Sequence, residues 1–456
     1  MNNKISGWED TIAAVATPAG TGGIGVIRVS GSQTYEIVQK LFPSKALQGQ
    51  SANTLHVGLL QDGDEILDEV VLALFKKPHS FTGEDVIEIS CHGSPYILQR
   101  VLDSLVRRGS RLAKPGEFTQ RAFLNGKMDL TQAEAVADII HAETKAAHDA
   151  AMNQLRGGFS LELNTLRDQL INFAALLELE LDFSDEDVEF ADRSQLKELV
   201  EVIAQKTMQL TDSFALGNVI KKGVSVAIIG KPNAGKSTLL NALLNEERAI
   251  VSEIAGTTRD TIEETVNING ILFRLIDTAG IRQHTTDKIE SLGIERSKKN
   301  AKQADLIIHV TDLTDPEDDP IWMNSFADKT ITVKNKFDLY YDQMKEQGIL
   351  MDPELNTISA RSGINLDWLK TALYEKAIAN KRSGDTIVTN ARHHEALLRM
   401  KESLDAIRSG LEEGLTGDLL TVDVRTCLHY LGEITGQVEV DRDILGTIFG
   451  KFCIGK

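Results

Sequence analysis

Apolar and polar positions near the start of the chain alternate with the period of β-strands. Five short runs, at residues 11–16, 25–29, 55–60, 66–75 and 85–91, are rich in apolar and β-branched residues and are separated by polar or glycine-containing segments. The turn Asp62-Gly63-Asp64 joins two of them as a predicted hairpin. Residues 94–107 have the period of a helix instead. We therefore predict a compact α+β domain in this region.

Two segments far apart in the chain share a helical period. Steps of three and four separate the apolar residues of each set, which places each set on one face of a helix. The first set is Leu163, Leu166, Leu170, Phe173 and Leu177, and the second is Leu397, Met400, Leu404, Ile407 and Leu411. Neither flank makes a complete bundle by itself. The pattern predicts one helical domain that is split by an insertion whose ends lie close together.

The apolar pattern between these helical segments is that of buried strands followed by helices. It predicts an inserted α/β domain at residues 216–380. The other predicted ranges are an α+β domain at 1–118, the first part of the helical domain at 119–215, and its second part with a C-terminal tail at 381–456. A chain of 456 residues is long enough for two to four domains of common size.

A glycine-rich segment follows the first strand of the inserted domain. Gly230, Gly235, Lys236 and Ser237 fit the pattern G-x-x-x-x-G-K-[ST], in which backbone N–H groups surround a β-phosphate. The lysine reaches the outer phosphates and the hydroxyl binds Mg²⁺. An ordinary strand-turn-helix corner is the alternative, but the preceding strand and the following apolar helix are the context that the motif requires. The predicted contacts are Asn233, Ala234, Gly235, Lys236, Ser237 and Thr238.

Three later motifs indicate which nucleotide is bound. Asp277, Thr278, Ala279 and Gly280 follow a strand, where the carboxylate can join the Mg²⁺ shell and the glycine N–H can face the γ-phosphate. Asn335, Lys336 and Asp338 follow another strand, and a carboxylate there can accept hydrogen bonds from the guanine ring. Ser359 and Ala360 suit a backbone contact to the guanine carbonyl. Together these motifs predict GTP rather than ATP.

The residue after Gly280 raises a mechanistic question. Many small GTPases place a glutamine there to orient the attacking water, whereas this chain has Ile281, which has no polar side-chain atom. A carboxylate farther along the chain could orient the water, and a cation could replace the arginine finger. Asn233 and residues 252–260 offer the oxygen ligands that a monovalent cation needs.

Composition limits the partners and the cellular compartment that the chain is expected to have. The formal net charge of −18 argues against broad adhesion to nucleic acid or anionic membranes. Three cysteines, an N-terminus without an apolar signal core and the lack of a membrane-spanning apolar run predict a cytoplasmic protein. RNA contact would then require a local patch or a partner.

Two polar strand residues and one terminal cysteine are further candidates. Arg28 and Glu88 each lie between apolar neighbours and so point to the opposite sheet face. A solvated face is one interpretation and a small polar ligand is the other. Cys453 lies near the C-terminal Lys456, where positive charge favours a thiolate, so it is either a reactive group or an inert thiol.

These features together resemble the tRNA modification GTPase MnmE (TrmE) family over essentially the whole chain. The matching stretches are residues 16–25, 80–85, 115–118, 121–125, 230–237 and 256–260, with the tail Phe-Cys-Ile-Gly-Lys. The resemblance implies a multidomain protein with an α+β folate-binding-like domain, an α-helical bundle and an inserted Ras-like α/β P-loop GTPase domain.

The resemblance also implies an activity and its partners. It implies a homodimer that binds a 5-formyltetrahydrofolate-type carrier and requires Mg²⁺ and K⁺. It implies a heterotetramer-type complex with the FAD-containing partner MnmG, in which a (carboxymethyl)aminomethyl-type group is added to the wobble uridine of tRNA. It implies no membrane partner.

Specific roles follow where this sequence matches the family motifs. Arg28, Glu88, Lys127 and Lys456 correspond to folate contacts, Ser237 and Thr258 to Mg²⁺ ligands, and Asn233, Ser252, Ile254 and Thr257 to K⁺ ligands. Ser252, Glu253, Ile254, Ala255, Gly256, Thr257 and Thr258 also join the nucleotide site. Glu290 corresponds to the water-orienting glutamate, although the segment after Gly280 is one residue longer than usual, and Cys453 to the cysteine needed for modification.

The alternative is an assembly or signalling GTPase of the Era or Der type, with flanking domains that only bind. That class would be indifferent to folate and would carry a basic RNA-binding domain. Two local basic clusters could contact tRNA or MnmG, or could simply be surface charges. They are Arg107, Arg108, Arg111 and Lys114, and Arg392, His393, His394 and Arg399.

Overall fold

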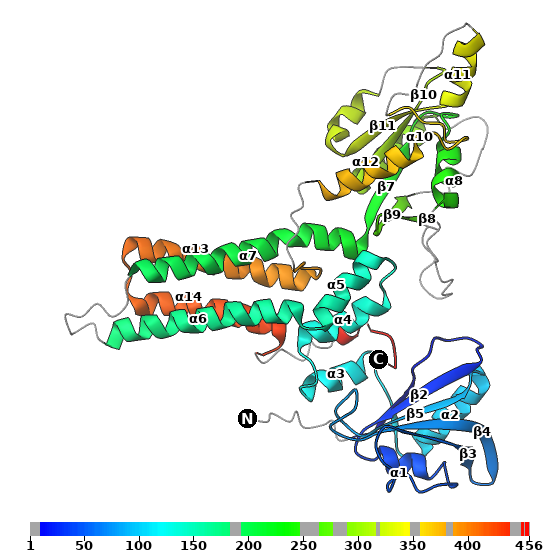
Figure 1. Cartoon of the computed structure of the whole chain (residues 1–456), viewed down its shortest axis with the longest axis vertical. Coiled ribbons are helices and arrows are strands. Elements are labelled where there is room, and N and C mark those ends of the chain that lie inside the picture. The colour runs from blue at the N-terminus through cyan, green and yellow to red at the C-terminus, as the bar shows by residue number, and fades with distance from the viewer. Residues whose placement is uncertain are drawn as a thin grey trace. The chain divides into compact units, whose positions relative to one another are not determined.

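The computed structural model describes residues 10–182, 193–246, 264–276, 290–315, 320–346, 356–379, 386–437, 448–450 and 452–455. The chain forms two compact units. One comprises Met1–Ile140, Gln154–Asp168 and Leu428–Lys456, and the other comprises His141–Asn153 and Gln169–Cys427. The architecture is multidomain and combines mixed sheets with long helices (Figure 1).

The first unit contains a six-stranded sheet in the order β3-β4-β5-β2-β1-β6. Its strands are β1 (Ile12–Val15), β2 (Ile24–Ser30), β3 (Thr54–Asp62), β4 (Glu65–Phe75), β5 (Val86–His92) and β6 (Arg111–Leu112). The five strand segments and the hairpin predicted from the sequence are confirmed. Except for the parallel pair β1–β6, neighbouring strands are antiparallel.

The two faces of this sheet differ. Helices α1 (Thr34–Gln39) and α2 (Pro95–Arg107) pack on one face with the buried residues Ile27, Leu72 and Ile89. On the opposite face, Leu55 and Val57 of β3 are 71% and 69% exposed. Alternation along each strand explains the difference, because successive side chains point to opposite faces.

The C-terminal tail packs within this first unit. Helices α3 (Glu117–Leu124) and α4 (Leu130–Ile140) follow the sheet, and Phe449 and Phe452 are buried with Leu130 and Ala133 of α4. These contacts place the exposed Cys453 close to the beginning of α3, where the Cys453 carbonyl accepts a hydrogen bond from Gly116 N–H at 3.4 Å.

Long helices carry both predicted apolar seams, all of whose members are buried. The seams lie on α6 (Gly158–Asp182) and α13 (Ala391–Glu413), and the neighbouring helices in the chain are α5 (Lys145–Leu155), α7 (Arg193–Lys222) and α14 (Gly417–Thr435). In the second unit, α7 and α13 pack along each other (Figure 1). Among the described residues, none of these helices combines the length and apolarity that crossing a bilayer requires.

The second unit also contains a five-stranded sheet in the order β11-β10-β7-β9-β8. Its strands are β7 (Val224–Ile229), β8 (Glu264–Ile268), β9 (Ile271–Ile276), β10 (Leu306–Asp312) and β11 (Thr330–Asn335). All pairs are parallel except β8–β9. The helices are α8 (Lys236–Glu246), α10 (Glu290–Gln303), α11 (Phe337–Glu346) and α12 (Leu366–Ile378), with a 3₁₀ helix at Ile321–Lys329.

Candidate functional site

The glycine-rich loop lies at the carboxyl end of β7, between that strand and α8. In parallel α/β sheets, ligands bind at the carboxyl ends of strands where the strand order reverses, and β7 occupies that position between β9 and β10. Lys236 is the first residue of α8, and Ser237 and Thr238 lie in its first turn. Helix N-termini attract phosphate groups, so the local fold suits the motif.

Hydrogen bonds inside the loop prepare the lysine for a phosphate. Lys236 Nζ donates to the carbonyl oxygens of Gly230 at 2.7 Å and Lys231 at 2.6 Å. Burial lowers the pKa of Lys236. A phosphate group can replace these neutral acceptors with charged ones, which strengthens the interaction.

Asn335 connects the glycine-rich loop to the candidate base-binding loops. Its Nδ2 donates to the Ala234 carbonyl at 2.9 Å, and its Oδ1 accepts from Ala360 N–H at 3.0 Å. A Cβ atom on Gly235, which has a φ of +95°, would lie 2.1 Å from Asn335 Nδ2. Position 235 therefore requires glycine, both because its φ is positive and because a side chain would collide with Asn335.

The carboxylate predicted to select guanine is held by a serine. Ser359 Oγ donates to Asp338 Oδ1 at 2.7 Å, and Phe337 N–H donates to the Ile358 carbonyl at 3.1 Å. Lys336 forms an ion pair with Asp312 at the end of β10. The structure thus brings together five predicted residues from three separate segments: Ala234, Asn335, Asp338, Ser359 and Ala360.

The second candidate site lies on the sheet face opposite α1 and α2, where Arg28 is 14% exposed. Arg28 Nε donates to Glu88 Oε1 at 2.9 Å, and Arg28 Nη1 donates to the Gly455 carbonyl at 3.5 Å. The Arg28 guanidinium also lies over the rings of Phe81 and Phe118, at 5.2 and 5.6 Å from their centroids. Arg28 and Glu88 therefore lie side by side on one sheet face, and the tail reaches Arg28 through the Gly455 carbonyl.

Lys127 lies against the loop that carries Phe81. Its Nζ donates to the Pro78 carbonyl at 3.0 Å, and its side chain lies next to Gly83. The aliphatic part of a lysine can pack while its ammonium group rotates among acceptors. Lys127 therefore has a charged donor that a ligand could recruit.

Two comparisons with known proteins decide the family. Residues 11–127 match the family model described as GTP-binding protein TrmE N-terminus, and residues 130–453 match the MnmE helical domain. The chain is 50% identical over 458 residues to the tRNA modification GTPase MnmE of Cytophaga hutchinsonii, covering 99% of both chains. The chain belongs to the MnmE family of tRNA modification GTPases.

Further curated relatives agree with this membership. The MnmE protein of Christiangramia forsetii is 48% identical, with 98% of this chain and 99% of the relative covered. That of Bacteroides fragilis strain ATCC 25285 is 49% identical, with 98% and 100% covered. The family assignment therefore holds over the full length of the relatives.

Several predicted site residues of this MnmE family member lie outside the described residues. They are Ser252, Glu253, Ile254, Ala255, Gly256, Thr257, Thr258, Asp277, Thr278, Ala279, Gly280 and Lys456. Glu290 begins helix α10, although its side chain is not among those described. The roles predicted for these residues remain predictions.

Sequence reasoning missed a buried ionic cluster around Arg121. Arg121, 1% exposed, donates to Asp10, Glu84 and the fully buried Glu117. Arg111 also donates to Glu117, at 2.7 Å. The spacing of Glu117 and Arg121, four residues apart on a helix, was the available signal.

The first of the two basic clusters is largely neutralised by ion pairs. Arg107 and Arg108 both pair with Asp62, and Arg111 pairs with Asp10 and Glu117. These pairs give the cluster a role in holding the β3–β4 hairpin and α3 in place. Whether either cluster contacts tRNA stays a prediction.

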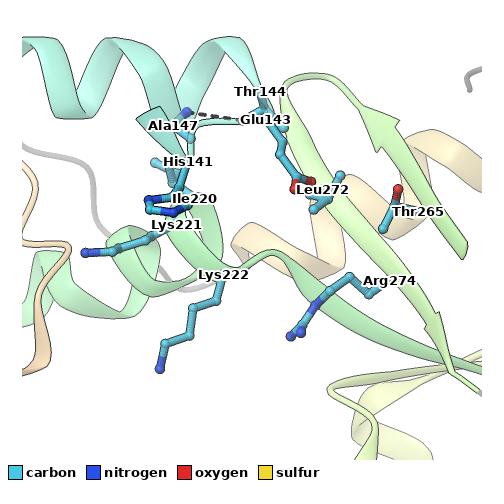
Figure 2. Close-up of a pocket in the computed structure, with 10 residues that line it drawn as sticks. All are labelled: His141, Glu143, Thr144, Ala147, Ile220, Lys221, Lys222, Thr265, Leu272 and Arg274. Atoms are coloured by element: carbon cyan, nitrogen blue, oxygen red, sulfur yellow. Dashed lines mark hydrogen bonds between the residues drawn. The ribbon is translucent and has the colours of Figure 1, made fainter. Parts of the chain in front are cut away.

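A cavity of about 250 Å³ lies at the passage from α7 to β7. Figure 2 shows Glu143 directed toward the strand segment that carries Leu272, and Thr144 Oγ1 accepting from Ala147 N–H at 3.2 Å. None of the predicted nucleotide or carrier residues lines this cavity. It is therefore separate from both candidate sites.

Proposed function

We propose that the chain binds and hydrolyses GTP through an inserted Ras-like α/β P-loop domain, at residues 216–380. Membership of the MnmE family makes it a GTPase that acts in tRNA modification. The observation that carries the site is the position of Asn335 between the phosphate loop and the Ala360 backbone. Through these two hydrogen bonds, Asn335 would link the loop that binds the guanine base to the loop that binds the phosphates.

Asp338 would select the base by its hydrogen-bonding pattern. An ionised carboxylate only accepts, which suits the N–H groups on one edge of guanine. Asp338→Asn would offer donors in place of one acceptor and should favour xanthine, which carries a carbonyl at that edge. Titration of the protein with GTP, ATP and XTP tests this: a wild type that binds ATP as tightly as GTP would contradict the proposed site.

The metal ligands follow from the same loop. Ser237 in the first turn of α8, together with Thr258, would bind Mg²⁺, which would neutralise phosphate charge. Asn233, with Ser252, Ile254 and Thr257, would bind K⁺, a hard cation suited to amide and carbonyl oxygens. Asn233 has a φ of +65° at the start of the loop's turn, which supports a specialised backbone position there. Glu290 would orient the attacking water.

The sheet face that carries Arg28 and Glu88 supports a second proposed activity, the binding of a 5-formyltetrahydrofolate-type carrier. Arg28 can pair with an anionic group, and Glu88 can accept from N–H groups of a pterin. Phe81 and Phe118 border the same place with aromatic surface. Lys127 and Lys456 would add charged donors.

The exposed apolar residues on this face support a homodimer. Leu55, Val57 and Ile66 are each more than half exposed, and contiguous apolar surface of this kind marks an interaction site. The N-terminal domain of a second copy, residues 1–118, would cover this apolar surface.

The remaining proposed ranges are the two parts of a helical domain, at 119–215 and 381–456. The first boundary falls inside a helix, because residue 215 lies within the continuous helix α7.

In the complete proposal, two copies of the chain act in the cytoplasm with the FAD-containing MnmG as a heterotetramer-type complex. They would add a (carboxymethyl)aminomethyl-type group to the wobble uridine of tRNA. Cys453, exposed and close to the carrier face through the docked tail, would serve this chemistry rather than hydrolysis. An assembly GTPase of the Era or Der type, by contrast, would not bind the reduced folate.

A further inference from the structure

His92 and Asp68 form an ordered pair at the end of β5. Both oxygens of the Asp68 carboxylate are used by the same residue: Oδ1 lies 2.7 Å from His92 Nδ1, and Oδ2 accepts from His92 N–H at 2.7 Å. The Asp68 side chain is 8% exposed, whereas that of His92 is 70% exposed. A nearly buried carboxylate therefore holds an imidazole that faces solvent.

This pairing determines which histidine atom is presented outward. Because an ionised carboxylate only accepts hydrogen bonds, Nδ1 carries the proton that it donates to Asp68. Nε2 is then the ring atom available to a ligand: it accepts a hydrogen bond in the neutral ring and donates one only in the imidazolium form. Such a buried partner fixes the orientation of a functional histidine.

His92 lies on the same sheet face as the Arg28–Glu88 pair. Glu88 and His92 are four residues apart on β5, so both point to one face, about 13 Å apart at the usual rise of a strand. The cross-strand row between them is Val26, Ser90 and Val71. Each of these three residues is half-buried. The face thus has two polar ends separated by a small, largely apolar middle.

We propose that His92, positioned by Asp68, binds the glutamate carboxylate of the folate-type carrier by donating from Nε2–H of its imidazolium form. This inference rests on the proposed carrier face. The carrier is elongated, with a pterin at one end, an aromatic ring in the middle and a glutamate at the other end. With the pterin at Arg28 and Glu88, the aromatic ring covers the Val26 row and the glutamate reaches His92.

Calorimetric titration with two carriers at about pH 6, where ordinary imidazole side chains are mostly protonated, tests the assignment. One is 5-formyltetrahydrofolate, and the other is 5-formyltetrahydropteroate, which lacks the glutamate. We expect His92→Ala to weaken binding of the first by about tenfold or more, the loss typical of a charge-assisted hydrogen bond, and to leave binding of the second unchanged. Asp68→Asn should produce the same selective loss in a smaller measure.

His148→Ala is the matched control, because His148 is also exposed and also lies near an aspartate, Asp149, at 3.3 Å. Unchanged binding of the pteroate compound shows that each variant is folded. If His92→Ala weakens both carriers equally, or neither, the His92 assignment is wrong. If the wild type binds neither compound, the carrier face itself is wrong, so the two failures are distinguishable.

Discussion

The Asn335 side chain donates to the Ala234 carbonyl at 2.9 Å, across 101 residues of sequence. The same side chain accepts from Ala360 N–H at 3.0 Å. One amide therefore uses its donor on the phosphate loop and its acceptor on the proposed base-binding loop. A side chain with acceptors alone cannot maintain both contacts.

Asn335→Asp should therefore weaken nucleotide binding. The carboxylate would face the Ala234 carbonyl without a donor, and breaking a buried hydrogen bond costs about 1–3 kcal/mol, or roughly tenfold to a hundredfold in affinity. We expect GTP and GDP to lose affinity alike in equilibrium titrations, with the preference for guanine over adenine retained because Asp338 is unchanged. Unaltered affinity would show that the bridge does not organise the site.

Glu290→Ala tests the residue proposed to replace the missing glutamine. Because Ile281 has no polar atom to orient water, we expect GTP turnover to fall by about two orders of magnitude or more. Nucleotide affinity should change little, since the residue would act on the water. Single-turnover hydrolysis and a separate binding titration measure the two effects.

Glu295→Ala is the matched control for this substitution. Glu295 is an exposed carboxylate on the same helix, α10, and is assigned no contact with nucleotide. We expect near-normal turnover for the control. If Glu295→Ala abolishes hydrolysis and Glu290→Ala does not, Glu290 is not the residue that orients the attacking water, and Glu295 has that role instead.

Gly455→Ala tests the docking of the tail. Gly455 has a φ of +96°, and a Cβ there would lie 2.3 Å from the Val15 carbonyl oxygen, so alanine cannot occupy the docked conformation. We expect tRNA modification to fall at least about tenfold while GTP hydrolysis is retained. The nucleoside composition of tRNA modified in vitro measures the first and phosphate release the second.

Ile454→Ala provides the comparison for the tail, because Ile454 is adjacent and 60% exposed. Its modification activity should stay close to that of the wild type.

Cys453→Ser should stop modification without displacing the tail. Full modification by Cys453→Ser would exclude a chemical role for the thiol.

The buried cluster around Glu117 predicts a pH-dependent stability. Burial alone would raise the pKa of Glu117, but hydrogen bonds from Arg111, Lys114 N–H and Arg121 outweigh it and hold the pKa below the ordinary value of 4.5. Folding then favours the ionised form, so the stabilisation is present above about pH 4.5 and is lost as the pH falls through the lowered pKa.

Glu117→Gln should lower the free energy of unfolding by about 3 kcal/mol near neutral pH, because it leaves two arginines with less compensating charge. The difference from the wild type should shrink below about pH 4 in urea titrations. Glu36→Gln serves as the control, since Glu36 pairs with Lys40 on the surface and should contribute little. An equal effect of both substitutions would contradict the role of the buried cluster.

Local patterns were sufficient to predict the strands, the helix seams and the phosphate loop. The seam residues between Leu163 and Leu177 and between Leu397 and Leu411 are buried as their period predicts, because periodicity depends only on neighbouring residues. The side-chain bridges could not be predicted in this way. Arg121 and Asp10 are 111 residues apart, and their contact depends on how α3 packs against the sheet.

The contacts of the C-terminal tail could not be predicted from local sequence patterns either. Nothing periodic in the last residues indicates that Gly455 fits against Val15 or that the Cys453 carbonyl meets Gly116 N–H. The resemblance to a family suggested a role for the tail, and the structure shows its contacts. His92 was also missed, because its partner Asp68 lies on a different strand.

The dependence of GTP turnover on K⁺ tests the central claim most directly. Turnover is measured in K⁺ and in Na⁺ at equal ionic strength, for the wild type and for Asn233→Gly, which removes the amide while tolerating the φ of +65°. We predict faster wild-type hydrolysis in K⁺ and no difference between the two salts for the variant. Equal wild-type turnover in both salts would contradict a potassium ion acting in place of the arginine finger.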